Sequence, residues 1–178
     1  MAGEYPLHVA SEYSSLAAFE KILETYPSAI DAVSHENRLM NSASRKRDLD
    51  FSYELAQNGL FGGTVAHHAT ARGDGNTDII LFIAREYSRL LEIPNDIGCL
   101  PLHSMLDWKS SCRVNGGMDI INAFEAVYSA FPAAINIRDS EGRFPIDHFL
   151  DIERTWTVED ISGALQFLQH RCPFLLRL

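Results

Sequence analysis

Seven histidines and three cysteines have the most specific chemistry in this sequence, because their nitrogen and sulfur atoms bind metal ions. Their spacing does not favour that use. His67 and His68 are adjacent and point in different directions on a helix, and no His-Glu-x-x-His pair occurs. Cys99, Cys112 and Cys172 are odd in number and fit neither a zinc spacing nor a disulfide framework. The sequence therefore predicts no metal, no cofactor, and thiols that stay reduced inside a cell.

Motifs for nucleophilic catalysis and phosphate binding are not found either. No Gly-x-Ser-x-Gly elbow occurs, and the glycine-rich stretch 59–64 lacks the Gly-Lys-Ser/Thr of a phosphate loop. Acidic residues are scattered over the expected helix faces, and no pair of them is placed for acid–base catalysis. We therefore expect a protein that is not an enzyme.

Charge and hydropathy argue against two classes of partner. The formal net charge of −9 repels phosphate backbones, which argues against nucleic acid. No apolar run approaches the roughly 20 residues that a transmembrane helix needs, so membrane insertion is not expected. The first residues also lack the basic and apolar regions of a signal peptide. An intracellular, cytoplasmic location is expected, with a nuclear one left open.

A short pattern that occurs four times explains the histidines in another way. In each copy a glycine stands three residues before a proline or valine, and a histidine or aspartate follows two residues after it. The copies contain Gly3, Pro6 and His8; Gly62, Val65 and His67; Gly98, Pro101 and His103; and Gly142, Pro145 and Asp147. Glycine at this place predicts a tight turn with a positive φ angle, and proline suits the first turn of a helix.

Longer segments of the chain also repeat. Residues 19–31 return as residues 124–136, with every matched position 105 apart. Apolar residues after each motif recur at the helical period of 3.6. These stripes are Leu16, Phe19, Ile22 and Leu23; Ile79, Phe82, Ile83 and Tyr87; Ile120, Ile121, Phe124, Val127 and Phe131; and Ile161, Leu165 and Leu168. Such a chain stacks copies of one helical unit, and each unit buries its apolar face against its neighbours.

The repeated motif resembles the hallmark of the ankyrin repeat, Gly-x-Thr-Pro-Leu-His-x-Ala, and the resemblance runs from Gly3 to about Pro173. In that family each repeat is a β-turn followed by two antiparallel helices, and the hallmark histidine hydrogen-bonds within and between neighbouring turns. The resemblance implies one all-α domain, an ankyrin-like solenoid of about five stacked helix-turn-helix units. The units are residues 3–35, 36–60, 61–95, 96–139 and 140–178, of which the second is degenerate.

The same resemblance implies a non-catalytic module that binds a protein partner through its turn tips and inner first helices. The tip candidates are His35, Glu36, Arg38, Asp96, Ile97, Ser140, Glu141 and Arg143, and the first-helix candidates are Ser11, Glu12, Arg72 and Ser104. Because the receptor is acidic, a basic partner segment is favoured.

A second hypothesis is a regulatory or targeting segment of a larger enzyme or channel-like protein. The chain begins close before its first motif and ends in an apolar tail, residues 172–178, whereas solenoids need polar caps for solubility. Both hypotheses leave the oligomeric state open.

The two tryptophans, Trp108 and Trp156, fall in equivalent extra stretches of adjacent units, between the expected first and second helices. Stacking brings such loops to one edge of a solenoid. Each tryptophan either caps its own helical layer or belongs to a partner-binding patch, since tryptophan is enriched in interface hot spots.

Replacing Trp108 or Trp156 by alanine distinguishes these two hypotheses. If the tryptophans form a patch, each substitution weakens partner binding by about 2 kcal/mol or more and leaves the melting temperature unchanged. Binding and thermal unfolding are measured on the same samples. A lower melting temperature with intact binding contradicts the patch and favours the cap.

Overall fold

The computed structural model describes residues 6–34, 62–71, 76–106, 118–150 and 169 of this 178-residue chain. These residues form helices and no strand, in agreement with the predicted all-α class. The helices are α1 (Pro6–Tyr13), α2 (Leu16–Thr25), α5 (Val65–Ala71), α6 (Thr77–Glu86), α7 (Pro101–Leu106), α8 (Met118–Ala130) and α9 (Pro145–Leu150), with the 3₁₀-helices η1 (Pro27–Asp31), η3 (Ser88–Glu92) and η5 (Pro132–Asn136). None of these helices is both long enough and apolar enough to cross a membrane.

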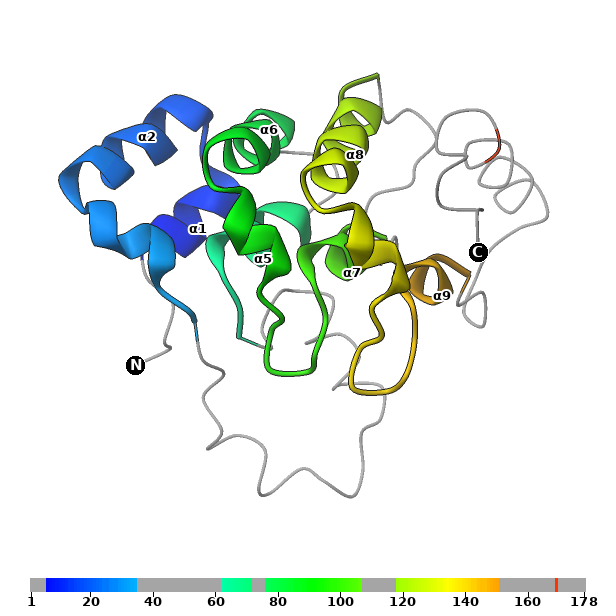
Figure 1. The fold of residues 1–178 in the computed structure, drawn as a ribbon. Coiled ribbons are helices and arrows are strands. Elements are labelled where there is room, and N and C mark those ends of the chain that lie inside the picture. Colours follow the sequence, from blue (N-terminus) through cyan, green and yellow to red (C-terminus); the bar gives the residue numbers. More distant parts are fainter. Residues whose placement is uncertain (1–5, 35–61, 72–75, 107–117, 151–168, 170–178) are drawn as a thin grey trace.

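The helices lie in two rows (Figure 1). One row contains α1, α5, α7 and α9, and each of these helices packs against the next. The other row contains α2, α6 and α8, which also pack in sequence. The loops that lead into α7 and α9 project together on one side of the first row (Figure 1). Contacts therefore run mainly between neighbouring helix pairs.

The predicted degenerate unit, residues 36–60, lies outside the described residues. Even so, α1 packs directly against α5 and α2 against α6, so no other helix pair stands between them in the rows. Ser34 and Gly63 are bridged by two backbone hydrogen bonds, with N···O distances of 2.8 and 2.9 Å. Helices of the first and third expected units are thus in direct contact, while the predicted second unit stays a prediction.

Burial follows the predicted apolar stripes in the described second helices. Phe19 and Leu23 of α2 are buried, as are Ile79 and Ile83 of α6, and Phe124 of α8 is fully enclosed. Both α2 and α8 end immediately before a residue that precedes a proline, because such a residue is pushed out of the helical region. Each described second helix is followed by a 3₁₀-helix that leads towards the next turn.

The predicted positive φ angles occur at three of the four motif glycines. The φ angle is 64° at Gly62, 77° at Gly98 and 81° at Gly142, while Gly3 lies outside the described residues. At Gly98 a second constraint is added, because a Cβ atom there would lie 2.8 Å from the backbone nitrogen of Ser140 in the next turn. Glycine thus permits both the turn and its close contact with the neighbouring turn.

Alanine substitutions at Gly98 and Gly142 separate these two constraints. Gly142→Ala should lower the free energy of unfolding by about 1–2 kcal/mol through the positive φ angle alone, because its Cβ would meet nothing within 4 Å among the described atoms. Gly98→Ala should lower it by about 1–3 kcal/mol more, because the Cβ crowds the next turn. Denaturant unfolding measures both, and equal losses would contradict the tight turn-to-turn contact.

Candidate functional site

The motif residues form hydrogen bonds inside each turn. Three equivalent bonds run from a backbone N–H to a side chain three residues later: Thr64 N to His67 Nδ1 (3.2 Å), Leu100 N to His103 Nδ1 (3.0 Å) and Phe144 N to Asp147 Oδ2 (2.7 Å). Asp147 therefore replaces the accepting nitrogen of histidine in the last copy. Because a carboxylate has no proton to donate, Asp147 cannot supply the second bond that histidine makes.

That second bond joins neighbouring units. Since Nδ1 of His67 accepts a backbone N–H, its Nε2 atom carries the proton and donates it to the Cys99 carbonyl at 2.9 Å. His8 makes the equivalent contact with the Gly63 carbonyl, with Nε2 and O 3.3 Å apart. For His103, no hydrogen bond of Nε2 is found among the described residues. The neutral ring of His67 thus forms one hydrogen bond within its own turn and one to the next turn.

Burial keeps these three rings neutral. It lowers the pKa of His8, His67 and His103 from 6.5 to about 4. A neighbouring histidine adds to the effect, His68 beside His8 and His148 beside His103. The backbone carbonyls near each ring favour a protonated ring but do not offset the loss of water.

The turn tips are organised by a carboxylate and by an equivalent amide. Asn95 Oδ1 accepts the backbone N–H groups of Ile97 (3.1 Å) and Cys99 (2.9 Å). In the next turn Asp139 Oδ1 accepts the equivalent pair, from Glu141 and Arg143, both at 2.9 Å. The two tips are also joined directly, because both the backbone N–H and the hydroxyl of Ser140 donate to the Ile97 carbonyl, at 3.0 and 2.5 Å.

The other oxygen of Asp139 is the centre of a buried polar cluster. Asp139 Oδ2 lies 3.0 Å from Arg143 Nε, 2.9 Å from His148 Nε2 and 3.8 Å from Cys99 Sγ. Burial by itself raises the pKa of Asp139, but the backbone N–H of Arg143, the His148 bond and the Arg143 charge lower it from 3.8 to about 2. The carboxylate is therefore ionised over the whole physiological range.

A second histidine cluster occupies the equivalent place between α1 and α5. Ser34 Oγ lies 3.0 Å from His68 Nε2, and Glu12 Oε2 lies 3.7 Å from His68 Nδ1. These are the residue types of an acyl-transfer triad, but Ser34 Oγ also lies 3.1 Å from the Gly63 carbonyl, which can only accept a proton. Satisfying both contacts makes His68 Nε2 the donor, whereas a general base needs its lone pair there. All three side chains are buried, so the contacts fit a structural role best.

The predicted partner-binding residues differ in their surroundings. Asp96, Ser140 and Glu141 are exposed, and Ile97 and Arg143 are partly buried. The Ser140 hydroxyl donates to the Ile97 carbonyl of the preceding turn, and Arg143 Nε donates to Asp139 within its own turn. The other tip candidates and both tryptophans lie outside the described residues: His35, Glu36, Arg38, Trp108 and Trp156.

Two first-helix candidates do not lie where the sequence pattern predicts. Ser11 and Glu12 are buried, and the Ser11 hydroxyl donates to the His8 carbonyl at 2.7 Å. Ser104 is partly buried, and Arg72 lies outside the described residues. Packing of α1 directly on α5 covers the helix face that the prediction left open to a partner.

Sequence reasoning missed the group formed by Cys99, Asp139 and His148. The three residues lie in two successive turns and in α9, so their spacing of 40 and 9 positions matches no local motif. The repeat itself contains a signal, because Asp139 stands six residues before Pro145, as Asn95 does before Pro101.

Comparison with known proteins identifies no relative. No protein-family model matches the chain, and the searches of curated proteins and of solved structures found no match.

Acidification tests the neutral histidines. The pKa of about 4 lies below the 6.5 of an unfolded chain, so the unfolded chain binds more protons between these two values. The stabilisation is complete above pH 6.5 and is lost as the pH falls towards 4, by about 1.4 kcal/mol per pH unit for each ring. The pKa of Asp139 is about 2 in the folded chain and 3.8 in the unfolded chain, so Asp139 loses its contribution to stability only at a pH below the range in which the histidines act.

Denaturant unfolding between pH 7.5 and 4.5 measures this loss. Ring-proton NMR shifts supply a second readout, because His8, His67 and His103 should remain unprotonated down to about pH 5, well below the ordinary histidine range. Stability that is constant across this range, together with ordinary titration of these rings, would contradict the proposed histidine role.

Proposed function

We propose that this chain is an ankyrin-like, non-catalytic module that binds a protein partner through its row of turn tips. The observation that carries the proposal is the direct bond between tips, in which Ser140 donates twice to the Ile97 carbonyl. The two bonded tips, which lead into α7 and α9, form a ledge of fixed spacing. A ledge of this kind suits recognition of a protein surface or an extended segment better than it suits enclosure of a small molecule.

The use of the histidines supports the non-catalytic part of the proposal. His67 is committed to two backbone bonds, one within its own turn and one to the next, and it is buried. Such a ring is not available to abstract a proton from a substrate. The motif histidines therefore favour an architectural role.

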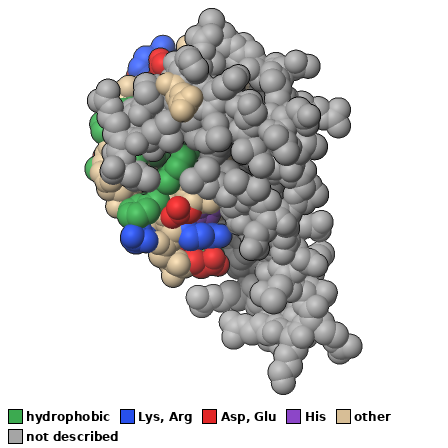
Figure 2. Space-filling view, turned by 90° about the vertical axis from the view of Figure 1, so that its right-hand side faces the viewer, with side chains coloured by type: hydrophobic (Ala, Val, Ile, Leu, Met, Phe, Trp, Pro, Cys, Tyr) green, Lys and Arg blue, Asp and Glu red, His purple; other side chains and the backbone are tan. Residues whose placement is uncertain are grey.

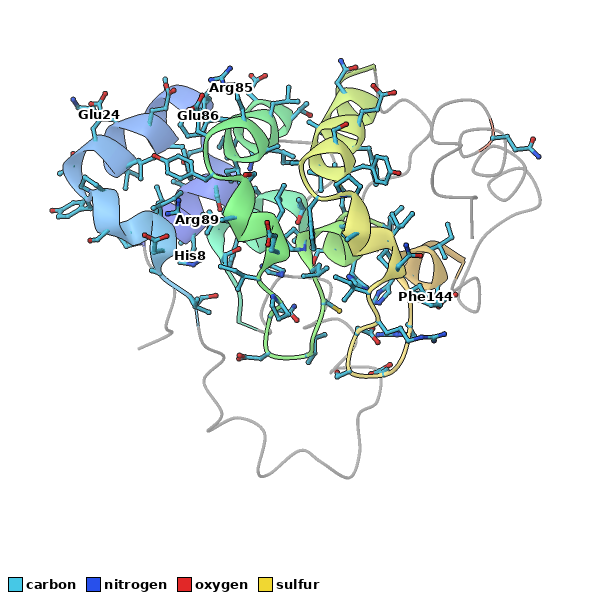
Figure 3. The ribbon with its side chains drawn as sticks, viewed as in Figure 1. His8, Glu24, Arg85, Glu86, Arg89 and Phe144 are labelled. Carbon is cyan, nitrogen blue, oxygen red and sulfur yellow. The ribbon has the colours of Figure 1, made fainter. Side chains whose placement is uncertain are left out.

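The exposed carboxylates of two tips support a basic partner segment, and one of them, Glu141, also pairs with Arg143 at 3.2 Å. Asp96 and Glu141 are exposed on successive tips, and each extends from a turn whose backbone is held by an Asx-type bond. Beside them the Arg138 guanidinium lies 3.8 Å from the centre of the Phe144 ring, which Figure 3 shows at the turn before α9. Figure 2 shows acidic and basic side chains gathered next to a hydrophobic patch on this side of the molecule. A basic segment that also carries an apolar side chain would match these features.

Charge reversal tests the ledge. The double variant Asp96→Lys and Glu141→Lys should weaken partner binding about tenfold or more, because like charges then face the basic segment. Partners are captured from the native cell with the wild-type chain, identified by quantitative mass spectrometry, purified and titrated against both proteins. Binding should also weaken as salt is raised.

A matched control variant makes the same change in charge on the second row of helices, α2, α6 and α8. Glu24 of α2 and Glu125 of α8 are exposed, and Figure 3 shows Glu24 projecting away from the turn tips. The double variant Glu24→Lys and Glu125→Lys should keep the captured partner. An equal loss of partner binding in both double variants would mean that only net charge matters. Full binding by the tip variant would refute the ledge.

A further inference from the structure

We propose that Cys99 Sγ, Asp139 Oδ2 and His148 Nε2 form a zinc-binding site that joins two successive turns to α9. These three ligand atoms all lie within 4.8 Å of one another. Cys99 Sγ and Asp139 Oδ2 are 3.8 Å apart, and His148 Nε2 and Asp139 Oδ2 are 2.9 Å apart. Tetrahedral zinc, with bonds of about 2.0–2.3 Å, holds its ligand atoms about 3.3–3.8 Å apart. To admit the ion, the His148–Asp139 contact must open by about half an ångström. Cys99 Sγ and His148 Nε2, which lie within 4.8 Å of each other, must stand about 3.8 Å apart or less.

The ligand types identify the metal class. A thiolate and an imidazole are borderline-soft ligands, and one carboxylate completes a set that zinc takes readily. Calcium and magnesium prefer oxygen ligands throughout, which Cys99 and His148 do not supply. The site thus fits Zn²⁺, with Co²⁺ as its spectroscopic substitute.

The scaffold holds the three ligands in place before any ion binds. Cys99 is fixed by its backbone N–H to Asn95, and Asp139 by its own turn bonds through Oδ1. The Asp139 and His148 side chains are 1% and 8% exposed, and Cys99 is 4% exposed, so the ligands need little rearrangement and compete with few waters.

Charge and protons balance at the site. The Cys99 thiolate and the Asp139 carboxylate neutralise Zn²⁺, and one proton passes from the thiol to solvent. The His148 ring stays neutral as its proton moves from Nε2 to Nδ1. Arg143 keeps its bond to Asp139 Oδ2 as an outer partner, and its own charge is balanced by Glu141, with Nη2 and Oε2 3.2 Å apart.

Only three protein ligands are assigned, and a water molecule would take the fourth position. His103 lies close by, with its ring centre 5.3 Å from that of His148. Because His103 Nδ1 accepts the Leu100 N–H, its Nε2 atom carries a proton and offers no lone pair.

The chain contains an internal comparison for this cluster. His68 stands three residues after Val65, as His148 does after Pro145, and each pairs with a turn residue. His68 Nε2 faces Ser34, a poor zinc ligand, in place of the Asp139 carboxylate, and Glu12 lies at the other ring nitrogen, 3.7 Å from Nδ1. The equivalent cluster around His68 should therefore not bind zinc.

The test uses the full chain with Cys112 and Cys172 replaced by serine, so that Cys99 is the remaining thiol. One equivalent of Co²⁺ should produce a thiolate charge-transfer absorption that Zn²⁺ then displaces, and Zn²⁺ should raise the melting temperature. Cys99→Ser should abolish the absorption. Asp139→Asn, which the equivalent Asn95 shows to be compatible with the turn, should weaken zinc affinity about tenfold or more. His148→Ser should do the same, and serine is the natural residue at the equivalent position of α7, Ser104.

Two controls separate this site from adventitious binding. His68→Ser changes the equivalent histidine of the other cluster, and Asp78→Asn removes an exposed carboxylate of α6; both should bind zinc as the parent does. Circular dichroism checks that each variant folds. The proposal is overturned if the parent gives no thiolate absorption, if the absorption survives Cys99→Ser, or if folded Asp139→Asn and His148→Ser bind zinc as tightly as the parent.

Discussion

A buried, neutral imidazole that accepts one hydrogen bond and donates another is the interaction on which this structure depends. At His67 the acceptor fixes the turn that starts α5, and the donor reaches the turn that starts α7. Only a neutral imidazole ring has an acceptor nitrogen on one edge and a donor N–H on the other. Burial makes protonation of this ring costly, so it preserves both hydrogen bonds. The same side chain therefore sets the local turn geometry and the packing of neighbouring units.

Much of the fold could be predicted from the sequence because its determinants are local. The φ angles at Gly62, Gly98 and Gly142, the stripes of the second helices and the helix ends before proline all follow from a few neighbouring residues. The packing of α1 on α5 could not be predicted in this way. Periodicity counts residues along the chain, and it contains no information on which helices of different units meet in space.

Less of the candidate site could be predicted. The motif pattern predicts that Asp147 replaces histidine in the last copy, and Asp147 accepts the Phe144 N–H as the motif histidines accept theirs. Exposure of Asp96 and Glu141 agrees with their predicted place on the tips, although their binding role stays a prediction. The cluster of Cys99, Asp139 and His148 depends on how one turn sits against the next, which no single repeat encodes.

The bridge between Ser34 and Gly63 has a consequence for the length of the chain. Because the two backbones are already held together there, the ends of the segment between them are closed whatever its size, and lengthening it would cost only the slow logarithmic growth of loop entropy. Insertions and deletions at this point should be tolerated while the helical rows keep their register. The same junction should therefore accept an inserted foreign peptide.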